Sequence, residues 1–137
     1  MIQTILDSGP LVAFYDRGDS WHAWAQKQLD ALAPPLLTCE PVLTEACFLL
    51  NRGGGNPTVV LKAVQEGTLR LALEVGKEAR ALQVLMQRYA DVPMSLADAC
   101  LVCLCERFQD PRVFTLDRDF RHYRRHGRQL IPLISHW

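Results

Sequence analysis

The segment VFTLDRDF, residues 113–120, ends an apolar and β-branched run with two aspartates. Val113–Leu116 has the composition of a buried strand, and Asp117 and Asp119 follow it directly or nearly so. Burial of an unpaired carboxylate costs free energy. We therefore expect these acids either to lie in a solvated cleft or to be neutralised by a cation.

An apolar run followed by an aspartate also occurs near the start of the chain. Ile2–Leu6 predicts a short buried strand, Asp7–Pro10 a turn, and the apolar residues after it a helix. Further strands are predicted at 35–38, 69–75, 111–116 and 129–134, helices at 20–32, 41–52, 56–69, 76–92 and 95–108, and a helix or turn at 117–127. This alternation predicts an α/β sandwich around a mostly parallel sheet. Ligands of such folds bind at the carboxyl ends of the strands, where Asp7 and Asp117 are expected.

Three of the predicted helices have recognisable starts. Ser20 and Ser95 are predicted N-caps, and an acidic residue stands three positions after Ser95. Pro41 suits the first turn of its helix, and the glycines after Arg52 end that helix.

The composition is typical of a globular protein, with 49% hydrophobic and 22% charged residues. A chain of 137 residues can bury a sizeable core, so we expect one domain over residues 1–137. No apolar stretch has the length of a membrane span, and Asp7 interrupts the first one. We expect no signal peptide, no membrane anchor and a cytoplasmic location.

The five cysteines offer two interpretations. Cys100, Cys103 and Cys105 form a C-x-x-C-x-C cluster, which suggests a metal site. The cluster lies in an apolar predicted helix, however, and no second cysteine pair or spaced histidine pair completes a tetrahedral site. We favour reduced core cysteines that act as small hydrophobic residues.

The formal net charge is zero, but the charges are unevenly distributed. Residues 118–128 hold five arginines and two histidines against one acid. Such a run is usually a solvated face. It is also the charge pattern that binds phosphate groups, and the run alone does not decide between the two.

Two further acids stand on predicted helices that are apolar nearly all round. Glu45 lies within VLTEACFLL and Asp98 within SLADACLV. Each has an ordinary explanation, because Asp98 suits a helix N-terminus and Glu45 could pair with an arginine. Four such acids, at two strand ends and on two apolar helices, are harder to explain separately.

Clustered carboxylates repel one another unless a cation neutralises them. Mg²⁺ and Mn²⁺ prefer oxygen ligands and suit such a cluster. A bound divalent ion activates water and stabilises charge on a phosphodiester, so these acids predict metal-assisted phosphodiester hydrolysis.

In their order and spacing, the segments LDSGPLVAFYD, TEACFLL, YADVPMSLADACLV and VFTLDRDF resemble PIN-domain proteins, particularly VapC-type ribonuclease toxins. The resemblance spans essentially the whole chain. It implies a three-layer α/β/α sandwich with a mostly parallel sheet of four to five strands.

The resemblance also implies roles for particular residues. The acidic quartet of the family, which provides the catalytic and metal-binding groups, corresponds to Asp7, Glu45, Asp98 and Asp117. Asp7 and Asp98 would be the principal Mg²⁺ (or Mn²⁺) ligands. Ser8, Thr115 and Asp119 correspond to accessory positions.

The implied activity is Mg²⁺-dependent endoribonuclease, with products that carry a 5′-phosphate and a 3′-hydroxyl. The implied partners are an RNA substrate, a cognate antitoxin protein and a second copy of the chain in a homodimer. Trp21, Trp24 and Trp137 are candidate dimer contacts, although core packing explains them equally well. Residues predicted to bind RNA are Arg118, Arg121, Arg124 and Arg125.

The sequence leaves a few alternative interpretations to consider. Glu40 competes with Glu45 as the helical acid, but it precedes Pro41 in a predicted turn. The D-x-D pattern of haloacid-dehalogenase-like phosphatases is excluded because only about eighteen residues follow Asp119, none of them lysine. A catalytically inactive PIN-like module that binds RNA or a protein remains the main alternative.

Overall fold

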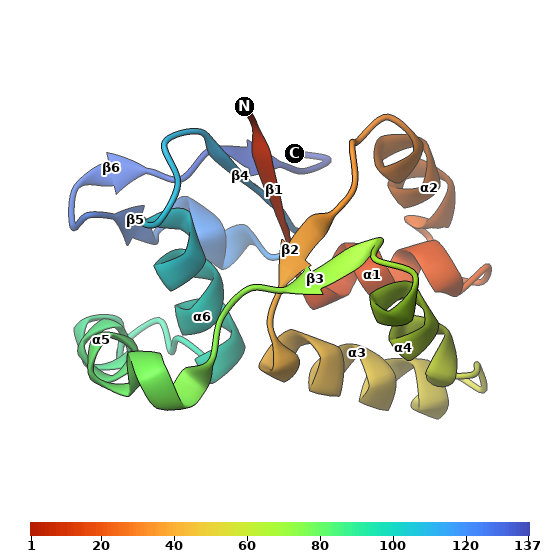
Figure 1. The fold of residues 1–137 in the computed structure, drawn as a ribbon, viewed down its shortest axis with the longest axis horizontal. Helices are drawn as coiled ribbons and strands as arrows, with labels where there is room; N and C mark the ends of the chain where they lie inside the picture. The colour runs from red at the N-terminus through yellow and green to blue at the C-terminus, as the bar shows by residue number, and fades with distance from the viewer.

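The fold is built on a parallel sheet of five strands in the order β3-β2-β1-β4-β7 (Figure 1). The computed structural model describes residues 1–137. The sheet strands are β1 (Gln3–Leu6), β2 (Leu36–Thr38), β3 (Leu69–Leu71), β4 (Pro111–Phe114) and β7 (Leu133–Ile134). Central strand β1 pairs Ile5 with Leu37 of β2 and with Val113 of β4. All of these pairings are parallel, so the carboxyl ends of the strands share one edge.

Helices cover both faces of this sheet. They are α1 (Ser8–Tyr15), α2 (His22–Asp30), α3 (Glu40–Arg52), α4 (Thr58–Gln65), α5 (Val75–Arg88) and α6 (Leu96–Cys105), with a 3₁₀ helix η1 (Arg118–Arg121) after β4. In Figure 1, α5 and α6 lie on one side of the strands and α1, α3 and α4 on the other. The predicted three-layer α/β/α architecture is confirmed.

Two apolar clusters, one on each face, hold the layers together. Consecutive strand residues point to opposite faces: Ile5 belongs to the cluster that contains α5 and α6 residues, whereas Leu6 belongs to the cluster that contains α1, α3 and α4 residues. Val113 and Phe114 of β4 divide in the same way. Both faces of the strands are therefore buried, as is usual for a parallel sheet.

The cysteines act mainly as core residues. All five thiols are free, and Cys39, Cys100, Cys103 and Cys105 are buried in the first cluster. Burial raises the pKa of Cys103 to about 11 and that of Cys105 to about 12, so both thiols stay protonated and unreactive at neutral pH.

Two helix starts differ from the prediction. The expected turn at Asp7–Pro10 is helical from Ser8 onward, because Asp7 is the N-cap and Pro10 falls in the first turn, where its missing N–H is not needed. Ser20 is not an N-cap: α2 begins at His22 with Trp21 as the cap residue, and no side chain caps it. Ser95 does cap α6, as predicted.

Two predicted strands also differ from the structure. The single strand expected at 129–134 is divided by Pro132 into β6 (Gln129–Leu130) and β7. β6 pairs antiparallel with β5 (Arg124–Arg125), whereas β7 pairs with β4. The strand expected at 69–75 is shorter and ends at Leu71.

None of the six helices is both long enough and apolar enough to cross a membrane.

Candidate active site

The four predicted catalytic acids line one cavity of about 560 Å³ at the carboxyl edge of the sheet. Asp7 follows β1, Asp117 follows β4, Glu45 lies on α3 and Asp98 on α6. The other lining residues are Ser8, Gly9, Leu49, Pro93, Ser95, Leu116 and Asp119, and none is basic. The fold thus brings carboxylates from four elements to one place without a neutralising side chain.

Asp7 is the most deeply buried of these acids, with 5% of its surface exposed. Its carboxylate accepts a hydrogen bond from the Ser8 N–H at 2.7 Å and one from the Thr115 hydroxyl at 2.6 Å. Burial raises the pKa of Asp7 to about 7, the two hydrogen bonds oppose this, and the nearby charges of Asp98 and Glu45 add to it. A cation beside Asp7 would restore its charged form.

Asp98 is held at the first turn of α6 by a capping box. Its N–H donates to the Ser95 hydroxyl at 3.0 Å, and the Ser95 N–H donates to Asp98 Oδ2 at 3.4 Å. Burial raises the pKa of Asp98, the hydrogen bond from Tyr123 lowers it, and the charge of Asp117 raises it again. The Ser95 N–H and the Tyr123 hydroxyl both donate to Oδ2 of Asp98. The other carboxylate oxygen, Oδ1, therefore keeps its lone pairs for another ligand.

Tyr123 is a site residue that the sequence analysis missed. Its hydroxyl donates to Asp98 Oδ2 at 2.9 Å, and its ring is fully buried against Phe120 and Tyr89. Burial and the charge of Asp98 raise the pKa of Tyr123, so the hydroxyl remains a donor. The sequence signal for it is the pair of aromatic residues Phe120 and Tyr123, three positions apart in a segment otherwise rich in arginine.

Glu45 and Asp117 complete the acidic lining from more open positions. Glu45 is exposed on α3, and Glu40, its competitor in the sequence, does not line the cavity. Asp117 caps η1 by accepting the Asp119 N–H at 2.9 Å. The Asp117 N–H donates to the Thr115 hydroxyl at 2.9 Å, so Thr115 joins Asp117 to Asp7.

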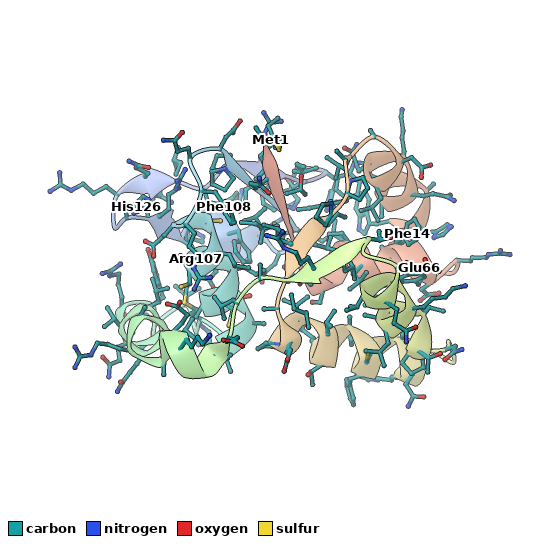
Figure 2. All side chains as sticks on the ribbon, viewed as in Figure 1. Met1, Phe14, Glu66, Arg107, Phe108 and His126 are labelled. Atoms are coloured by element: carbon teal, nitrogen blue, oxygen red, sulfur yellow. The ribbon has the colours of Figure 1, made fainter.

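The four arginines predicted to bind RNA fall into two groups. Arg118 and Arg121 are exposed. Arg124 is half-buried and donates to the carbonyls of Arg121 and Tyr123, and Arg125 is buried and donates to the Phe108 carbonyl at 2.6 Å. Figure 2 labels Phe108, whose carbonyl accepts this hydrogen bond, and His126, which follows Arg125 in the chain. The burial of Arg125 and its hydrogen bond to a carbonyl argue against the predicted contact of this side chain with RNA phosphates.

The donor set of the cavity fits a hard divalent cation. Carboxylates and hydroxyls supply only oxygen ligands, which Mg²⁺ and Mn²⁺ prefer. In the structure no three Asp, Glu, His or Cys side chains are grouped closely enough to hold a metal ion as they stand. Acids that share a cavity repel each other, and a divalent cation removes that repulsion.

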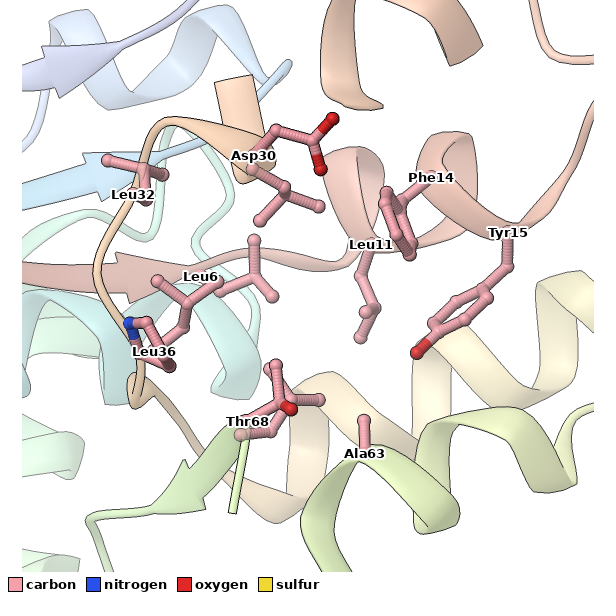
Figure 3. A pocket seen from close by; sticks show the side chains of 12 residues that line it. Leu6, Leu11, Phe14, Tyr15, Asp30, Leu32, Leu36, Ala63 and Thr68 are labelled. Atoms are coloured by element: carbon pink, nitrogen blue, oxygen red, sulfur yellow. The ribbon is translucent and has the colours of Figure 1, made fainter. Parts of the chain in front are cut away.

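A second pocket lies close by but has a different character. It measures about 200 Å³ and is lined mainly by apolar side chains, among them Leu6, Leu11, Phe14 and Leu36 (Figure 3). Asp30 is its one acidic lining residue. The neighbours Leu6 and Asp7 thus line different cavities, and only the one lined by Asp7 contains a cluster of carboxylates.

Comparison with known proteins identifies similar sequences and structures. The family model of the PIN domain matches residues 4–126, a range that contains all four acids. Ribonuclease VapC26 of Mycobacterium tuberculosis is 28% identical over 121 residues, which cover 87% of this chain and 88% of that protein. The crystal structure of VapC20 from the same organism, a sarcin-ricin loop cleaving toxin, matches with a TM-score of 0.70 and 27% identity, covering 85% of this chain and 92% of that one.

Proposed function

Since this chain belongs to the PIN domain family, we propose that it is a metal-dependent endoribonuclease that hydrolyses RNA phosphodiester bonds. The observation that carries the proposal is the cavity lined by Asp7, Glu45, Asp98 and Asp117 without a basic residue. The similarity of this chain to ribonuclease VapC26 and to the toxin VapC20 supports RNA as the substrate class.

In this proposal Asp7 and Asp98 are the principal ligands of Mg²⁺ or Mn²⁺, and Glu45 and Asp117 complete the acidic lining. A bound ion would activate water and stabilise charge on the phosphodiester, and attack by that water would leave a 5′-phosphate and a 3′-hydroxyl. Thr115 holds the Asp7 carboxylate through its hydroxyl, and Tyr123 holds that of Asp98. Asp119 and Ser8 are accessory groups at the cavity wall.

The same similarities support a biological role. We propose that the protein is the toxin of a type II toxin–antitoxin pair, that it acts in the cytoplasm as a homodimer, and that a cognate antitoxin binds it. Sequencing of the neighbouring gene tests this role, since a small adjacent gene that encodes a DNA-binding segment is expected.

The central test is RNA cleavage by purified protein. Wild type in Mg²⁺ should cleave, whereas EDTA, Asp7→Asn and Asp98→Asn should each lower the rate by about 100-fold or more, because each removes the cation or one of its ligands. Glu40→Gln is the matched control, since Glu40 is an exposed acid on α3 outside the cavity. Equal residual activity in every sample would identify a contaminating nuclease.

One observation favours a second candidate, an inactive PIN-like module that binds RNA or a protein. No preformed group of metal-binding side chains is present. A module of this kind would bind RNA with the same affinity in Mg²⁺ and in EDTA and would leave it intact. Mg²⁺-dependent cleavage that is lost in Asp98→Asn would exclude it.

A further inference from the structure

Arg118 and Arg121 differ from Arg124 and Arg125, whose guanidinium groups donate to backbone carbonyls at 2.6–3.1 Å, because both are exposed and lie near one aromatic ring. Neither takes part in any of the four salt bridges of the structure. Arg118 makes no side-chain hydrogen bond, and Arg121 makes one long contact of 3.4 Å to the Arg118 carbonyl. Two exposed cations without a protein anion suit an external one.

Trp137 holds both of these side chains. The guanidinium carbon of Arg118 lies 5.8 Å from the Trp137 ring centroid and that of Arg121 lies 5.4 Å from it. These distances are within the range of cation–π interactions. A guanidinium on an aromatic face keeps its in-plane N–H donors free, and these donors match the geometry of a phosphate.

The sheet directs this cluster toward the edge that carries the acidic cavity, although none of its three residues lines the cavity itself. Ile134 at the end of β7 accepts a hydrogen bond from the Thr115 N–H at 3.1 Å, so residues 135–137 continue past the edge that carries Asp117. Arg118 follows Asp117 directly. His136, which stacks on Trp21 with ring centroids 3.6 Å apart, fixes the path of the chain just before Trp137.

We propose that Trp137 positions Arg118 and Arg121 as a paired site for backbone phosphates of single-stranded RNA at the mouth of the acidic cavity. The inference rests on the proposed function and deepens it. The cavity itself repels RNA because its charged lining is entirely acidic. Preorganised cations at its rim supply the attraction that the cavity lacks, and Trp137 is a positioning residue rather than a catalytic one.

The first experiment tests the arginine pair. In an Asp7→Asn background, which prevents cleavage, the affinity for a fluorescent single-stranded RNA is measured by anisotropy at several salt concentrations. Arg118→Ala/Arg121→Ala should weaken binding about tenfold or more at low salt and reduce the slope of log affinity against log salt by about 1.4, or 0.7 per lost phosphate contact. Arg112→Ala, an exposed arginine near the amino end of β4, should change neither value.

The second experiment tests the role of Trp137. Trp137→Ala should weaken RNA binding several-fold, and Trp137→Phe should restore most of it, because the ring face returns. In the double arginine background Trp137→Ala should cause no further loss. A further loss there would show that Trp137 binds RNA directly and would overturn the positioning role.

The outcomes separate this inference from the proposed function. A wild type that cleaves RNA, with variants that bind RNA as tightly as their parent, refutes the paired site alone. A wild type that does not cleave RNA refutes the proposed function, whatever the variants do. If polyglutamate of equal charge competes as well as RNA, the pair is an acidic-peptide site and the assignment to RNA is wrong.

Discussion

Asp7 illustrates the conflict between burial and charge at this site. Its carboxylate is almost fully enclosed, its two protein partners are neutral donors, and its nearest charged neighbours are other acids. A buried carboxylate without a cation favours the protonated form. The stability of the metal-free protein should therefore depend on the protonation of Asp7.

This dependence has a defined sign. The pKa of Asp7 is about 7 in the folded protein and 3.8 for the ordinary group, so the folded state binds the proton more tightly. In EDTA the contribution of Asp7 to the free energy of unfolding should fall as pH rises from about 4 to 7, by at most about 4 kcal/mol. Asp7→Asn should gain stability over wild type between pH 5 and pH 8 in urea unfolding. Asp91→Asn, an exposed acid, is the control and should not.

Tyr123 gives a prediction about metal binding. Tyr123→Phe keeps the buried ring but removes the hydroxyl that orients Asp98. Groups that orient metal ligands typically contribute 10- to 100-fold to affinity, so Mn²⁺ should bind at least about tenfold more weakly in a calorimetric titration. Tyr89→Phe is the matched control, because Tyr89 packs on Tyr123 but its hydroxyl accepts the Arg124 N–H instead. Equal Mn²⁺ affinity in Tyr123→Phe and wild type would contradict the orienting role.

At the scale of helices and strands, a boundary is predicted correctly where several local signals agree on it. Where a pattern and a cap agree, as at Ser95, the helix begins as predicted. Ser20 has the right residue type, but the chain turns there through Asp19, whose side chain accepts the Trp21 N–H, and the helix begins later. The apolar run at 129–134 continues across Pro132, yet each half pairs with a different strand. Such pairings depend on tertiary contacts that no local pattern records.

Substitution of Ser95 and Ser20 tests the difference between a serine that caps a helix and one that does not. Ser95→Ala removes the cap of α6 and should lower the free energy of unfolding by about 1 kcal/mol. Ser20→Ala removes an exposed hydroxyl that caps nothing and should change it by less than about 0.5 kcal/mol. Urea unfolding of both variants checks the pair. Equal losses would mean that the Ser95 hydroxyl does not stabilise α6.

At the scale of the whole molecule, the sequence indicates the four acids that share the cavity but not Tyr123, which hydrogen-bonds to Asp98. Asp7 and Asp117 follow recognisable strands, and a parallel sheet sends both to one edge. Tyr123 reaches Asp98 only because α6 and the segment after η1 pack on the same face of the sheet. A contact of this kind depends on the path of the chain in three dimensions, and neither charge nor periodicity indicates it.

A cation that joins the four acids should stabilise the whole fold, because their carriers β1, α3, α6 and β4 span both apolar clusters. Saturating Mn²⁺ should raise the free energy of unfolding by about 2.7 kcal/mol at one hundred times its Kd. Thermal unfolding with and without Mn²⁺ checks this. Asp7→Asn and Asp98→Asn should lose the gain and Glu40→Gln should keep it; stabilisation in all three variants would place the ion elsewhere.

The Thr115 hydroxyl donates to Asp7 and accepts from the main chain of Asp117, so one oxygen atom supports two of the four acids. Substitutions at positions 7 and 115 should therefore be constrained together during evolution. A lineage that loses the hydroxyl disturbs two acids with one nucleotide change, while Thr115→Ser preserves both links. Among descendants of a common ancestor, these two positions should covary more strongly than either does with position 45.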